Sequence, residues 1–116
     1  MVSTDPAAVL ATERAATQAR IASLQGDVDT IVGSASSTTG DDEHDPEGAT
    51  IGFERAQALA LLAQARHHLT EIDAALARHA DGSYGTCVVC GRPIAPERLA
   101  ARPTAMHCVH CAGRHS

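Results

Sequence analysis

Two pairs of cysteines constrain the fold of this chain more than any other feature. Cys87 and Cys90 form one C-x-x-C pair, Cys108 and Cys111 form a second, and 17 residues separate the two pairs. Each pair can wrap two thiolates around one ion, and the intervening stretch brings the pairs together as a tetrahedral four-cysteine set. Because four sulfurs leave no open coordination position, we predict one structural Zn²⁺ with these cysteines as its ligands. Two disulfides or two redox dithiols are the alternative interpretation.

The rest of the sequence bears on the cellular compartment. It contains no run of about 18 apolar residues, and its first sixteen residues lack the basic leader and apolar stretch of a signal peptide. We therefore expect no association with a membrane and a cytoplasmic location, where reducing conditions favour metal binding over disulfides.

The first 80 residues have the pattern of two long helices. The first should begin at Asp5-Pro6 and end at about Val32, before Gly33; the second should run from about Pro46 to about His79. Apolar residues recur in both at alternating spacings of three and four, which is typical of a coiled-coil seam. These residues are Ile21, Leu24, Val28 and Ile31, then Ala58, Leu62, Ala65, Leu69, Ile72 and Leu76.

Each apolar stripe is shielded from water only if it packs against the other. We therefore predict a mainly α fold: a long antiparallel helical (coiled-coil) hairpin over residues 1–80, followed by a small four-cysteine zinc-finger lobe over 81–116. The chain has one Phe, one Tyr and no Trp. Much of the apolar content, 44% of the chain, is alanine. Because alanine buries little area, this composition argues against a thick globular core.

Charge is concentrated where the hairpin should bend. The stretch GDDEHDPEG, residues 40–48, holds five acids between Asp41 and Glu47. Residues 1–80 contain twelve acids and five arginines, or −7, and residues 81–116 contain two acids and four arginines, or +2. This balance argues against direct, sequence-specific DNA binding, which requires a basic face. A connection as long as 33–45 is typical either of a functional loop or of a disordered one.

The zinc-finger segment carries a resemblance to a known family. The stretch DGSYGTCVVCGRPIAPERLAARPTAMHCVHC, placed after a long hairpin with an acidic tip, resembles the DksA/TraR family of C4 zinc-finger transcription factors. The resemblance implies a protein that binds RNA polymerase through its secondary channel, with the hairpin tip near the active centre, and that alters the stability of open complexes. Asp42, Asp45 and Glu47 would be the working acids of that tip.

The resemblance leaves some positions open. Asp42 and Asp45 match the spacing of two tip aspartates in the family, whereas alignment from the first cysteine makes Asp45 the first acid and puts Gly48 in place of the second. Some members bind ppGpp, and Arg98 and Arg102 match finger positions of that kind. The second predicted helix, however, carries Glu71 and His68 where basic or apolar partners for ppGpp are expected. This difference argues against dependence on ppGpp. The alternative role of both arginines is to brace the lobe, for example through Glu97 or Asp73.

Two other functions fit the same features. The first is stimulation of transcript cleavage in the manner of Gre factors, with tip acids holding a second Mg²⁺. The second is a zinc-ribbon adaptor that uses its coiled coil to bind a protein partner or to dimerise. An intramolecular hairpin predicts a monomer. No nucleophile–base pair can be recognised in the sequence, so we predict that the protein is not an enzyme.

Overall fold

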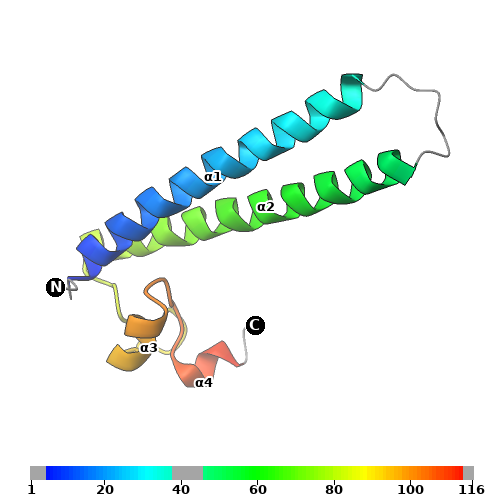
Figure 1. Cartoon of the computed structure of the whole chain (residues 1–116). Coiled ribbons are helices and arrows are strands. Elements are labelled where there is room, and N and C mark those ends of the chain that lie inside the picture. Colours follow the sequence, from blue (N-terminus) through cyan, green and yellow to red (C-terminus); the bar gives the residue numbers. More distant parts are fainter. Residues whose placement is uncertain (1–4, 38–45, 114–116) are drawn as a thin grey trace. The chain divides into compact units, whose positions relative to one another are not determined.

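The structure is a computed structural model that describes residues 5–37 and 46–113, without the side chains of 34–37 and 46–49. Its helices are α1 (Pro6–Ser37), α2 (Pro46–Asp81), α3 (Pro96–Ala101) and α4 (Val109–Ala112) (Figure 1). The prediction of a mainly α fold is thus confirmed. No helix in these ranges is both long enough and apolar enough to cross a membrane.

The chain divides into two compact units, each containing a part of α1 and a part of α2. One unit comprises residues 1–15 and 69–116, and the other comprises residues 16–68. The boundary expected between residues 80 and 81 stays a prediction.

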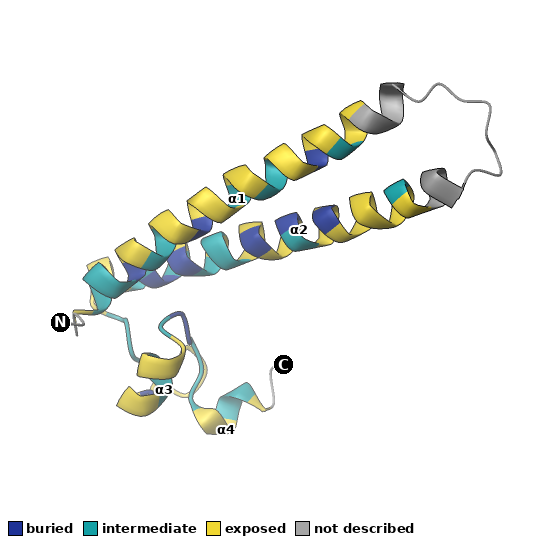
Figure 2. Cartoon of the chain, in the orientation of Figure 1, coloured by how far each residue is buried: buried dark blue, intermediate teal, exposed yellow. Residues whose placement is uncertain are grey.

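In the unit formed by residues 16–68, the second half of α1 packs antiparallel on the first half of α2. Val28, Ala58 and Leu62 are buried, and the predicted stripe residues Ile21, Leu24 and Ile31 pack against them. Figure 2 shows the buried residues on the sides of the two helices that face each other. The heptad spacing therefore predicted this seam correctly.

In the other unit, the start of α1 packs on the end of α2. Leu10, Ile72 and Ala75 form its buried core, with Leu76 and Tyr84 packed against them. Across the same pair of helices, Arg14 Nε donates to Asp73 Oδ1 at 2.6 Å. The hydrogen bond with Asp73 raises the pKa of Arg14, but both side chains are exposed enough for water to screen the pair.

The two long helices end differently from one another. The prediction that α1 ends near Val32 is wrong, because the helix continues for five residues to Ser37. A glycine costs a helix only about 1 kcal/mol, so Gly33 does not stop a helix whose preceding turns are packed.

The end of α2 follows the sequence signal. Gly82 adopts a φ of 84°, and the Ser83 N–H bonds to the Arg78 carbonyl at 2.9 Å, which is a Schellman motif. The Ser83 hydroxyl and N–H both donate to Asp81 Oδ1, and these bonds lower the pKa of Asp81.

Candidate metal centre

The first cysteine pair lies in a tight hairpin stabilised by backbone hydrogen bonds. Thr86 and Pro93 form an antiparallel bridge, and the Cys87 N–H donates to the Arg92 carbonyl at 2.8 Å. Gly91 closes the turn by donating its N–H to the Cys87 carbonyl at 3.0 Å. Its φ of 76° lies in the left-handed region that favours glycine.

The second pair lies at the start of a short helix. Cys108 is the N-cap of α4, and Cys111 lies within that helix. The Val88 N–H donates to the Met106 carbonyl at 2.9 Å, which ties the turn of the first pair to the segment preceding the second.

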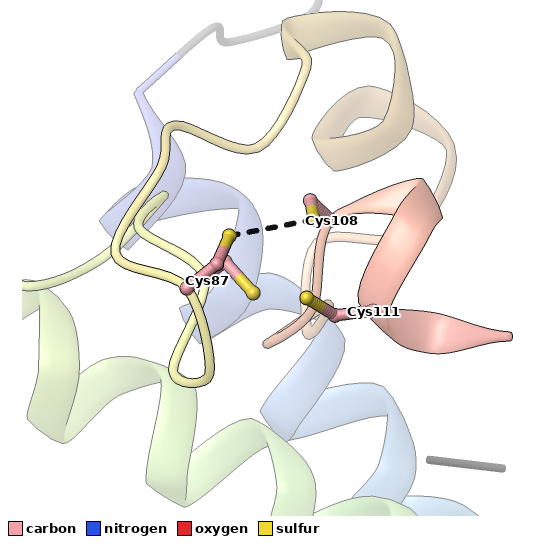
Figure 3. Close-up of side chains that lie close together, drawn as sticks. Cys87, Cys108 and Cys111 are labelled. Carbon is pink, nitrogen blue, oxygen red and sulfur yellow. Dashed lines mark hydrogen bonds between the residues drawn. The ribbon is translucent and has the colours of Figure 1, made fainter. Parts of the chain in front are cut away.

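The four cysteine sulfurs converge on one point. Every pair of their Sγ atoms lies within 4.8 Å, and the Sγ atoms of Cys90 and Cys108 are 3.7 Å apart. Zn–S bonds of ~2.3 Å place two sulfurs of a tetrahedron about 3.8 Å apart, so this donor set fits one zinc ion. All four cysteines are free, and 3.7 Å far exceeds the ~2.05 Å of a disulfide. Figure 3 shows the side chains of Cys87, Cys108 and Cys111 turned toward one another.

Backbone amides already favour ionised sulfur at this site. The N–H groups of Cys90 and Cys108 point at the Cys87 sulfur and lower the pKa of that thiol to about 5. The Cys111 N–H likewise lowers the pKa of Cys108, whereas the hydrogen bond between their side chains raises the pKa of Cys111 to about 12. Four crowded sulfurs cannot all ionise without a counter-charge, and a divalent cation would provide it.

Side chains outside the cysteine set hold the loops around it. Arg78 Nη2 donates to the Ser83 carbonyl at 3.0 Å and to the Thr86 carbonyl, one residue before Cys87. The Tyr84 hydroxyl donates to the Pro103 carbonyl at 2.8 Å. Neither residue was predicted from the sequence to take part in the site. The position of Arg78 in the last turn of α2 was the only signal, since a cation there can reach terminal carbonyls.

The two predicted arginines both make contacts within this lobe and the adjoining helix end. Arg98 Nε donates to the His107 carbonyl at 2.9 Å, next to Cys108. Arg102 forms an ion pair with Glu71 at 3.6 Å. Neither arginine contacts Glu97 or Asp73, the partners suggested from the sequence, in these contacts. Asp73 pairs with Arg14 instead.

The side chains of the three predicted tip acids are not described by the structure. Asp42 and Asp45 lie outside the described residues, and Glu47 lies in α2 without a described side chain. Their role as tip residues stays a prediction.

Known proteins resemble this chain in sequence and structure. Residues 82–116 match the family described as prokaryotic dksA/traR C4-type zinc finger. Over 67 residues the chain is 45% identical to the RNA polymerase-binding transcription factor DksA of Caulobacter vibrioides, covering 58% of this chain and 47% of that protein. Over 64 residues it is 42% identical to the uncharacterized protein YteA of Bacillus subtilis, covering 55% of this chain and 27% of that protein. The chain thus spans less than half the length of these curated relatives.

The structural comparison extends over nearly the whole chain. The structure of transcription factor DksA2 from Pseudomonas aeruginosa matches with a TM-score of 0.79 at 32% sequence identity, covering 95% of this chain and 79% of that one. The four cysteines are positioned for one structural zinc, as expected of a C4-type finger. These similarities show that the chain belongs to the DksA/TraR family of C4-type zinc-finger proteins.

Proposed function

We propose that this protein is a transcription regulator that binds RNA polymerase and has no catalytic activity of its own. The observation that carries the proposal is the match to DksA2 over 95% of the chain, including both the helical hairpin and the finger lobe. The 45% identity to a DksA protein described as RNA polymerase-binding supports the same partner. A polymerase partner places the protein in the cytoplasm.

The hairpin enters the secondary channel of the polymerase, and its tip shortens or extends the lifetime of open complexes. Asp42, Asp45 and Glu47 give the tip a local negative field, which acts on a Mg²⁺-bearing active centre or on basic elements around it. The finger lobe stays outside the channel with its zinc in a purely structural role. The protein binds as a monomer, without sequence-specific contacts to DNA and without a requirement for ppGpp.

The decisive measurement is the lifetime of promoter open complexes on the cognate polymerase after challenge with a competitor. Wild-type protein should change this lifetime, and the double variant Asp42→Ala/Asp45→Ala should remove the change while keeping its zinc and its affinity for polymerase. Asp5→Asn is the control, since Asp5 is an exposed acid at the start of α1 and asparagine can keep the hydrogen bond that Asp5 accepts from the Ala7 N–H. If saturating wild-type protein binds but leaves the lifetime unchanged, the proposed action of the tip is wrong.

A further inference from the structure

A groove of about 330 Å³ lies between α1 and α2 within the unit formed by residues 16–68. Leu24 and Ile31 from α1 and Leu61 from α2 line it with apolar side chains. All three remain only partly buried, because two helices cannot cover the full width of each other's apolar stripe. The groove is therefore an apolar surface that this unit leaves open to solvent.

Carboxylates flank the apolar surface on both helices. Asp27 of α1 and Glu54 of α2 line the groove and are exposed. Neither carboxylate forms an ion pair or a side-chain hydrogen bond with another residue in the described ranges. The whole segment 16–68 contains eight acids and three arginines, or −5. A ligand with a positive charge therefore complements this groove.

An exposed aromatic residue lies beside the groove. Phe53 precedes Glu54 on α2, and 79% of its surface is exposed. It lies one turn before Gln57, which also lines the groove. A large apolar side chain on an outer helix surface has no role in the seam, whereas aromatic residues that become buried on association are often energetic hot spots.

We propose that this groove binds a segment of the polymerase that presents an apolar side chain next to an arginine or lysine, an inference that rests on the proposed function. The apolar side chain covers Leu24, Ile31 and Leu61, and the cation lies between Asp27 and Glu54. Exclusion of water by the apolar contact strengthens that ion pair. The volume is at the lower end of the ~300–1,000 Å³ of small-molecule pockets, and an open groove suits a protruding protein segment better than a cofactor.

Reversal of one charge in the groove tests the inference against a close control. Asp27→Arg puts a cation beside the proposed basic residue, whereas Asp29→Arg makes the same change two residues, or about 200°, around the helix. Binding of full-length, zinc-loaded protein to purified cognate polymerase should weaken about tenfold for Asp27→Arg and for Glu54→Arg. Asp29→Arg should change the affinity by less than about threefold. Circular dichroism checks that all variants keep their helix content.

Photo-crosslinking locates the partner segment. A crosslinking residue in place of Gln57 should form adducts with a polymerase peptide that contains an apolar residue beside Lys or Arg. The same residue in place of Leu59, about 200° around α2, should not. Equal affinity of Asp27→Arg and wild type, or adducts between two copies of this chain at position 57, would overturn the inference alone. Failure of wild-type protein to bind polymerase would overturn the proposed function and the inference together.

Discussion

Arg78 connects the last turn of α2 to the loop that leads into the first cysteine pair. Its Nη2 atom donates to the carbonyls of Ser83 and Thr86, and Thr86 directly precedes Cys87. Its Nη1 atom is buried without a hydrogen-bond partner in the described part of the chain. The substitution Arg78→Met retains much of the aliphatic stem and removes both hydrogen bonds, so it measures what the guanidinium contributes.

The contacts set the expected size of the effect. A hydrogen bond from a charged donor contributes about 1.5–3 kcal/mol, so two contribute about 3–6 kcal/mol. The buried, unpaired Nη1 group costs about 1–3 kcal/mol, and the variant is relieved of that cost. With the middle value of each range, Arg78→Met should lower the free energy of unfolding by about 2–3 kcal/mol. Because Thr86 is adjacent to a metal ligand, the variant should also lose zinc faster to a chelator.

Urea unfolding of the zinc-loaded protein, followed by tyrosine fluorescence, measures the effect. Tyr84 is the only Tyr and the chain has no Trp, so the signal comes from one position beside this loop. Arg92→Met is the matched control, since Arg92 is exposed in the same lobe. Free energies of unfolding for the two variants that agree within about 0.5 kcal/mol would refute the structural role of the Arg78 hydrogen bonds.

Three further outcomes are expected. Ile72→Ala should lower the free energy of unfolding by about 2–5 kcal/mol, because Ile72 is fully buried; the exposed Leu59→Ala should change it far less in the same urea titration. Burial raises the pKa of Tyr84, so its contribution to stability is fully present below the unfolded pKa of ~10 and is lost as the pH rises through the folded pKa. Its phenolate absorbance should titrate at higher pH in native than in denatured protein, and equal midpoints would contradict this. Removal of zinc should abolish the amide-exchange protection of Cys87 and Ile94 while α1 and α2 keep theirs, since zinc contributes ~10–16 kcal/mol in small fingers; protection of both amides in metal-free protein would argue against a structural metal.

The sequence predicted the seam well because it is a matter of periodicity. Alternating spacings of three and four placed Val28, Leu62 and Ile72 on the buried sides of their helices, as observed. The stripe at the start of α1 was missed, although Leu10 and Thr17 are both buried. These two positions are seven residues apart and continue the heptad back from the predicted stripe. This early part of the apolar stripe is hard to recognise in the sequence because a polar residue, Thr17, occupies one of its positions.

The candidate site was predictable only where local spacing determines it. Two C-x-x-C pairs can form a single metal site whatever path the intervening chain follows, and the sulfurs do converge. The hydrogen bonds of Arg78, Tyr84 and Arg98 end on backbone carbonyls instead. Any residue offers such an acceptor, so only the path of the loop decides which carbonyl a side chain reaches. The pairing of Arg102 with Glu71 depends on the same path.

The open groove follows from the small side chains of the seam. In residues 16–68, Ala58 and Ala65 occupy buried positions where leucine or isoleucine would fill more space. Alanine lets two helices approach closely but contributes little buried area, and the larger Leu24 and Ile31 stay partly exposed at the edge. Two helices can cover only the sides that face each other, so a third element is needed to cover the apolar side chains left at the edge. A partner in the groove supplies that element, so binding should also stabilise this part of the hairpin against unfolding.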